Sequence, residues 1–127
     1  GTRFVCCTEC IAHPAFKKAI MNAGDRDTIV GGRSTGHPVR ALKNRFSREF
    51  EKMESSGANL GELDRFGSGR FRSACIDGDV EWGSILAGQI AGIVEDVAPA
   101  AEIIKRVMEE AEEVLAGLAR GFFGFCT

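Results

Sequence analysis

The chain opens with Gly1-Thr2-Arg3-Phe4-Val5, in which a glycine and a small hydroxyl residue precede a short apolar step. A glycine lets backbone N–H groups approach an anion closely, so the pair suits a phosphate bound at the end of a strand. The pair alone is unspecific, because tight turns of many kinds use the same residues. We therefore expect the chain to start inside a fold, at a strand end with a candidate phosphate loop at Gly1 and Thr2.

Further short motifs follow this opening in a defined order. They are Gly1-Thr2-Arg3-Phe4, Thr8-Glu9-Cys10, Ala12-His13-Pro14, Asp27-Thr28, Gly36-His37-Pro38-Val39-Arg40, Lys43-Asn44 and Ala87-Gly88-Gln89-Ile90-Ala91-Gly92. In this order and at these intervals, residues 1–118 resemble the C-terminal part of the flavin-dependent (type II) enoyl-acyl carrier protein reductases. These enzymes are close relatives of the nitronate monooxygenases, formerly called 2-nitropropane dioxygenases.

The resemblance implies an α/β fold, namely the C-terminal fragment of an FMN-binding (β/α)8 TIM barrel that is mostly α-helical in the part present. The chain has 127 residues, whereas a complete barrel needs roughly 250. The implied organisation places the end of the last barrel strand, the phosphate loop and the following helix at 1–24. An α-rich lid over the flavin follows at 25–97, then a terminal helix at 98–120 and a Phe-rich tail at 121–127.

Composition limits the partners. Sixteen basic and eighteen acidic residues give a net charge of −2, so no overall field favours nucleic acid or a membrane surface. No apolar stretch reaches the roughly 20 residues that span a bilayer, and no signal segment opens the chain. We expect a cytoplasmic protein that binds neither nucleic acid nor membrane.

Five cysteines, an odd number, fit reduced thiols better than a disulfide framework. Cys6, Cys7, Cys10 and His13 have a spacing that could hold zinc. Because no second ligand pair follows at finger-like spacing, small buried cysteines explain the group better. No metal site is predicted.

The hydrophobic pattern predicts the elements. Pro14 and Gly24 frame a helix with Phe16 and Ile20 inward, and a β-like step over 27–30 precedes a glycine-rich loop over 31–36. A helix from Pro38 to Ser55 is expected, because apolar residues recur at three- and four-residue spacing and form one buried stripe of Val39, Leu42, Phe46, Phe50 and Met53. A helical turn near Leu63, a helix over 71–76 and a helix over 80–93 are expected to follow. A last helix follows Pro99, with these residues inside: Ile103, Ile104, Val107, Met108, Ala111, Val114, Leu115 and Leu118.

The resemblance also implies site residues. Gly1 and Thr2 would bind the FMN phosphate, Gln89 would lie near the flavin ring, and Leu86 would form a wall of the acyl tunnel. The alternative for 86–89 is a helix that packs tightly through small residues, with Gln89 satisfied by backbone. His37 would shape a turn at a helix start or contact a substrate phosphate at its rim. The family's proposed catalytic histidine precedes Gly1, so no catalytic residue is assigned here.

Two charged features remain open. Arg3 is expected to form a structural salt bridge rather than to serve the phosphate. Basic residues gather at Arg33, Arg40, Lys43, Arg45 and Arg48, which would suit an acidic acyl carrier protein; the alternative is a solvated face paired with Glu49 and Glu51.

The implied activity of the intact enzyme is reduction of enoyl thioesters by NAD(P)H through FMN, in fatty acid synthesis. Its substrate would be carried by acyl carrier protein or be a small molecule, and a homodimer is one assembly left open. The alternatives are a nitronate monooxygenase that oxidises alkyl nitronates with O2 and a non-catalytic helical binding module. The fragment by itself is expected to be inactive.

Overall fold

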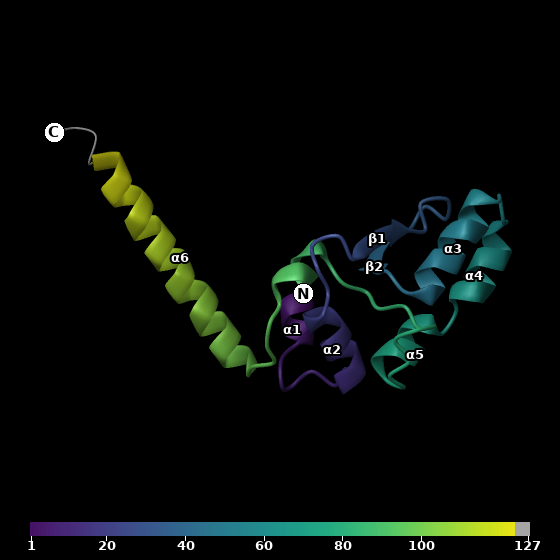
Figure 1. The fold of residues 1–127 in the computed structure, drawn as a ribbon, viewed down its shortest axis with the longest axis horizontal. Helices are drawn as coiled ribbons and strands as arrows, with labels where there is room; N and C mark the ends of the chain where they lie inside the picture. The colour runs from purple at the N-terminus through teal and green to yellow at the C-terminus, as the bar shows by residue number, and fades with distance from the viewer. Residues whose placement is uncertain (124–127) are drawn as a thin grey trace.

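The structure is a computed structural model that describes the backbone of residues 1–123 and the side chains of residues 1–118. Its elements in chain order are α1 (Thr2–Val5), α2 (Pro14–Met21), β1 (Thr28–Gly31), β2 (Val39–Leu42), α3 (Arg45–Ser55), α4 (Leu60–Gly67), α5 (Arg70–Cys75), the 3-10 helix η1 (Gln89–Ile93) and α6 (Ala100–Phe123). Helices thus dominate around a small two-stranded sheet (Figure 1). No helix in the described part is long and apolar enough to cross a membrane.

The predicted strand end at residues 1–5 is wrong. Gly1 is the N-cap of helix α1, and its carbonyl oxygen accepts hydrogen bonds from the N–H groups of Phe4 and Val5 at 3.0 and 3.1 Å. A glycine followed by a hydroxyl residue is as compatible with a helix start as with a strand end, since both use backbone N–H groups that lack a local partner.

Helix α2 is confirmed and forms the centre of the main core. Pro14 occupies the first helical position, and His13 caps the helix by accepting the Ala15 N–H at Nδ1, 3.1 Å away. Phe16 and Ile20 are both buried. Around them pack Cys6, Ala12, Leu42, Ala74, Ile85, Ala87, Ala91 and Val94.

A β-hairpin follows α2: the predicted β-like step is strand β1 and the predicted glycine-rich loop connects it to β2, a second strand that was not predicted. Strands β1 and β2 pair antiparallel, with Ile29 opposite Ala41 and Gly31 opposite Val39. Gly32 and Gly36 in the connecting loop both have φ of +78°, a conformation that glycine adopts without steric cost.

The helix predicted from Pro38 is wrong over its first third, because residues 39–42 form β2. Helix α3 starts instead after Asn44, whose side chain accepts the Ser47 N–H while the Ser47 hydroxyl accepts the Asn44 N–H. This reciprocal capping box fixes the helix start. The predicted end at 55–57 is confirmed, and the turn near Leu63 is the two-turn helix α4.

The helix predicted over 80–93 is also wrong. Residues 85–87 run beside β2, where the Leu42 N–H donates to the Ile85 carbonyl and the Ala87 N–H donates to the Arg40 carbonyl. Only η1 is helical. Gly83 lets this segment approach its neighbours closely, because a Cβ there would lie 2.5 Å from the Ala74 Cβ and 2.3 Å from the Asp79 carbonyl oxygen.

The last helix begins one residue after Pro99 as predicted, but most of its apolar residues are not inside. Of the predicted set, Ile103 is buried at 2% exposure, whereas Val107, Val114 and Leu118 are more than half exposed. The reason is that α6 leaves the remainder of the described chain after its first turns (Figure 1). The predicted tail 121–127 is helical to Phe123, and residues 124–127 lie outside the described residues.

Candidate functional site: an apolar pocket beside the Thr2–Gly88 contact

One face of the sheet lines an apolar pocket. Side chains alternate along a strand, so the residues that share a face with Ala41 are Ile29 and Val39, and Leu86 joins them because it pairs with Ala41 across an isolated antiparallel bridge. The opposite face carries Leu42, Ile85 and Ala87 into the core. The sheet therefore separates the main core from a second apolar space.

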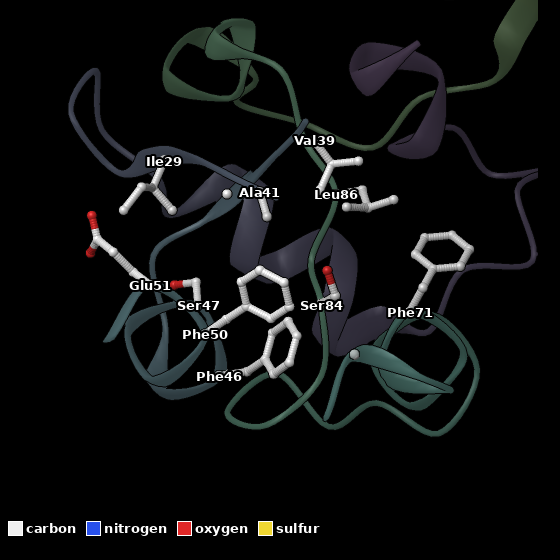
Figure 2. A pocket seen from close by; sticks show the side chains of 12 residues that line it. Ile29, Val39, Ala41, Phe46, Ser47, Phe50, Glu51, Phe71, Ser84 and Leu86 are labelled. Atoms are coloured by element: carbon white, nitrogen blue, oxygen red, sulfur yellow. The ribbon is translucent and has the colours of Figure 1, made fainter. Parts of the chain in front are cut away.

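Helices α3 to α5 close the other side of this pocket. The lining residues are Ile29, Gly31, Val39, Ala41, Phe46, Ser47, Phe50, Glu51, Gly67, Phe71, Ser84 and Leu86, around a volume of about 240 Å³. Figure 2 shows Leu86 and Phe71 on one side and Ile29 and Glu51 on the other, with the Phe46 and Phe50 rings between them. The polar groups are few, since nine of the twelve lining residues are apolar or glycine.

The same segment that supplies Leu86 also contacts the opening of the chain. The Gly88 N–H donates to the Thr2 hydroxyl oxygen at 2.8 Å, and α1 packs against η1. Two extended residues span about 7 Å, so Leu86 in the pocket and Gly88 at Thr2 are near neighbours. The structure thus brings together Thr2, Gly88 and Leu86, three positions from the two segments singled out in the sequence.

The start of α1 offers donors that fit a phosphate. The N–H groups of Thr2 and Arg3 have no hydrogen-bond acceptor among the described residues, and no side chain caps the helix at Gly1. A Cβ added at Gly1 would meet nothing within 4 Å. Because Thr2 accepts from Gly88, its hydroxyl hydrogen can still be donated outward.

Gln89 and His37 lie in different places. Gln89 starts η1 directly after the Thr2 contact, with an exposed side chain. His37 lies in the hairpin loop, not at a helix start, and lines an open depression of about 610 Å³ with Leu60 and Asp64 of α4. Phe50 borders both this depression and the apolar pocket, so His37 is on the far side of Phe50 from Leu86. Their predicted roles remain predictions.

Arg3 forms the salt bridge that was predicted. Its guanidinium bonds the Asp96 carboxylate and donates to the Asp96 carbonyl oxygen at 2.8 Å. Arg106 contacts the other carboxylate oxygen of Asp96 at 2.7 Å. The hydrogen bond from Arg106 is the main cause that lowers the pKa of Asp96 below its ordinary value. Arg3 therefore helps to attach α6 to α1.

The cysteine and histidine group has structural contacts. His13 caps α2, and a Cβ at Gly78 would lie 2.4 Å from its Nδ1 atom, so the ring lies directly against Gly78. Burial raises the pKa of the Cys6 thiol. The Lys17 ammonium donates to the carbonyl oxygens of Cys7 and Cys10 at 2.6 and 2.8 Å. Among residues 1–118, no three acidic, cysteine or histidine side chains gather as metal ligands.

Three of the five basic residues, Arg40, Lys43 and Arg45, have partners other than Glu49 and Glu51. Arg40 donates to the Thr28 hydroxyl, Lys43 donates to the Arg26 carbonyl, and Arg45 pairs with Glu81 while stacking 4.9 Å from the centre of the Trp82 ring. Glu49 pairs instead with Lys52.

The structure places Leu86 in the lining of this pocket, but its aromatic side was not predicted from the sequence. Phe46 and Phe50 were expected on a buried stripe, and Phe71 within a helix, with no link among them. The helical spacing of Val39, Leu42 and Phe46 concealed strand β2, and the available signal for a later helix start was the N-cap residue Asn44.

Comparison with known proteins gives the family. Residues 1–110 match the model of the family described as nitronate monooxygenase. A probable nitronate monooxygenase of Staphylococcus saprophyticus is 24% identical over 115 residues, which are 91% of this chain and 32% of that protein. A Mycobacterium tuberculosis protein, (3aS,4S,5R,7aS)-5-hydroxy-7a-methyl-1-oxo-octahydro-1H-indene-4-carboxyl-CoA dehydrogenase, is also 24% identical, over 87% of this chain and 42% of its own length.

Solved structures of two enzymes are also similar to this chain. FabK from Thermotoga maritima superposes with a TM-score of 0.89 at 38% identity, over 96% of this chain and 38% of FabK. Nitroalkane oxidase from Streptomyces ansochromogenes gives a TM-score of 0.72 at 27% identity, over 93% of this chain and 33% of its own. The chain thus spans 32% to 42% of the length of these relatives. The chain belongs to the nitronate monooxygenase family.

Proposed function

We propose that the whole protein containing this chain is an FMN-dependent oxidoreductase of TIM-barrel fold that reduces enoyl thioesters with NAD(P)H. The observation that carries this proposal is the single segment 86–88, which links the apolar pocket at Leu86 to Thr2 through the Gly88 N–H. An enzyme that reduces a double bond next to a thioester needs an apolar chain site close to its cofactor. Likeness to FabK at 38% identity supports this choice.

Each residue has a defined part in this proposal. The free N–H groups of Thr2 and Arg3, with the Thr2 hydroxyl, would hold the FMN phosphate, while Leu86 would contact the acyl chain. Gln89, exposed beside Thr2, would offer its amide near the ring, and His37 would lie at the rim where a phosphate-bearing carrier arrives. FMN, when bound, supplies hydride transfer from the nicotinamide to the enoyl double bond.

A basic surface on the same part of the chain would receive an acidic acyl carrier protein in the cytoplasm. The Arg48 side chain is exposed and makes no hydrogen bond or ion pair within residues 1–118, whereas the Arg45 side chain pairs with Glu81. Charge reversal at Arg48 should weaken turnover of carrier-bound substrate and its salt dependence, and should spare a small thioester. Equal losses with both substrates would count against carrier docking.

The second candidate is a nitronate monooxygenase that oxidises alkyl nitronates with O2. The family match over residues 1–110 and the likeness to nitroalkane oxidase favour it. The two activities need different substrates in the same flavin site, so an experiment with both substrates must distinguish them.

The test has two arms on the whole protein: the flavin is reduced anaerobically with NADH or NADPH and offered an enoyl thioester, and separately the protein with oxidised flavin is offered a nitronate with O2. Reoxidation by the enoyl thioester, with formation of the saturated thioester, supports the reductase. Turnover of the nitronate alone supports the monooxygenase. Absence of bound flavin from the whole protein would contradict both and favour a binding module.

Leu86→Trp tests the link between pocket and reaction. This change should block the enoyl substrate and leave flavin binding and reduction by the nicotinamide intact, because the Thr2 contact involves Gly88 and not Leu86. Overpacking of an ordinary core residue would instead lower stability by about 1–3 kcal/mol. A lowered Tm with unchanged enoyl kinetics would refute the assignment.

A further inference from the structure

The apolar pocket between the hairpin and α3 is not filled by side chains of the described chain. A sheet face covered by a helix is normally filled by side chains, yet about 240 Å³ remain here. For comparison, an engineered apolar cavity of about 150 Å³ holds benzene, and pockets for drug-sized ligands start at about 300 Å³. The space therefore suits a short, narrow apolar group.

The space exists because small residues face the Phe50 ring. A Cβ added at Gly31 would lie 3.6 Å from Phe50 Cδ1, and one added at Gly67 would lie 3.7 Å from Phe50 Cε2. Ala41, in the middle of the sheet face, adds a single methyl group. Phe50 thus borders the pocket with a glycine close to each of two ring edges, so its position sets how far an occupant can extend.

The surroundings of the pocket disfavour a charged occupant. The three polar lining residues are Ser47, Glu51 and Ser84. Ser47 is already engaged by Asn44 in the capping box, and Glu51 carries a negative charge with its carboxylate turned away from the Phe50 ring in Figure 2. A carboxylate or phosphate would find no cationic partner among the lining residues, whereas a neutral hydrocarbon chain needs none.

We infer that this pocket holds the distal end of the acyl chain, and that Phe50, set between Gly31 and Gly67, limits the chain length that the protein accepts. The inference rests on the proposed function, since it names the part of the substrate that Leu86 leads to. Phe50 is a specificity-determining residue here and has no part in the reacting atoms.

Binding of saturated thioesters tests the inference without any chemistry. Straight-chain acyl thioesters of N-acetylcysteamine with 4 to 12 carbons have no double bond to reduce, so calorimetry on the whole protein measures binding alone. Each methylene that enters the pocket should raise affinity about fourfold, until the chain reaches Phe50 and the affinity levels off. Affinity that does not depend on chain length would overturn the inference.

Three variants test which residues limit the length of the bound acyl chain. Gly31→Val narrows the pocket, so the affinity should level off at least one carbon earlier than in the parent protein. Phe50→Ala opens it, so the affinity should continue to rise for longer chains. Phe66→Ala is the matched control, because Phe66 belongs to the same aromatic cluster, 6.5 Å from Phe50 between ring centres, but does not line the pocket. It should leave the chain-length profile unchanged.

The outcomes separate the inference from the proposed function. A profile that shifts with Gly31→Val in a protein that reduces no enoyl thioester supports the pocket and contradicts the reductase. Turnover of enoyl thioesters with a profile that ignores Gly31→Val supports the reductase and overturns the pocket. Should Phe50→Ala fail to fold, the comparison of Gly31→Val with the parent protein still decides the matter.

Discussion

At the scale of single residues, Thr2 determines how the opening of the chain meets the pocket-lining segment. Thr2→Val keeps the shape of the side chain but removes the acceptor of the Gly88 N–H, which is 2.8 Å away. Leaving a partly buried donor unpaired should cost about 1–3 kcal/mol. Chemical unfolding measures this cost, and the flavin affinity of the whole protein should fall with it.

Thr2→Ser is the control for this prediction, because it retains the hydroxyl and should keep both the stability and the flavin affinity near those of the parent. If Val and Ser behave alike in both measurements, the hydrogen bond to Gly88 contributes nothing, and the link between the two segments must lie elsewhere.

The residues of the candidate site could be predicted from the sequence only in part. The resemblance gave Gly1, Thr2, Leu86 and Gln89 as members of one site, and the structure brings Thr2 next to the segment that holds the last two. The hydrogen bond between Gly88 and Thr2 could not be predicted, because its partners are 86 residues apart and no local sequence pattern encodes such a contact. His37 was grouped with them, yet the hairpin places it beyond Phe50.

At the scale of elements, local signals predicted helix ends better than helix identities. Pro14 and Gly24 framed α2 correctly, since proline and glycine act on the backbone directly. The spacing of Val39, Leu42 and Phe46 predicted a helix at the position of β2. Three apolar residues at this spacing fit one face of a helix as well as a short strand followed by a turn, so the pattern does not distinguish the two. The N-cap at Asn44 was the signal that decides between them.

Asn44 provides an element-scale prediction. Its side chain caps α3 and also donates to the carbonyl oxygens of Val80 and Gly83 at 2.9 and 2.8 Å, which holds the connection leading to residues 85–87. Asn44→Ala should therefore destabilise the fold by about 2–3 kcal/mol.

The matched control is Asn59→Ala at the start of α4. Asn59 forms the same kind of capping box with Glu62, but its side chain makes no hydrogen bond beyond its own helix start among residues 1–118, so its loss should cost about 1 kcal/mol. Denaturant unfolding of both variants measures the difference. Equal costs would show that the bonds to Val80 and Gly83 add nothing to the cap.

At the scale of the whole molecule, α6 is attached near its start. The Glu9 carboxylate accepts the Ala100 N–H with both oxygens, at 3.1 and 3.0 Å, and Asp96 joins Arg3 of α1 to Arg106 of α6. The Thr8 N–H donates to the Ala98 carbonyl beside them. Carboxylates therefore make much of this attachment, so its strength must depend on pH.

The direction of that dependence follows from the pKa shifts. Hydrogen bonds from the Glu9 backbone N–H and then from Ala100 lower the pKa of Glu9 below its ordinary value of 4.5, and Arg106 lowers that of Asp96 below 3.8. A lowered pKa means that the ionised form is favoured in the folded state, so this stabilisation is present above the ordinary values and is lost as pH falls through the lowered ones.

The attachment of α6 should accordingly be unchanged from pH 7 down to about 5 and weaken below about 4. The amide shift of Ala100, followed by NMR, should titrate with a midpoint below 4.5, because its N–H bonds the Glu9 carboxylate. Glu9→Gln should abolish that titration and make the first turn of α6 exchange its amide hydrogens faster at neutral pH. Glu112→Gln, on the exposed surface of the same helix, is the control and should do neither; a titration at Ala100 that survives Glu9→Gln would show that Glu9 does not cap α6.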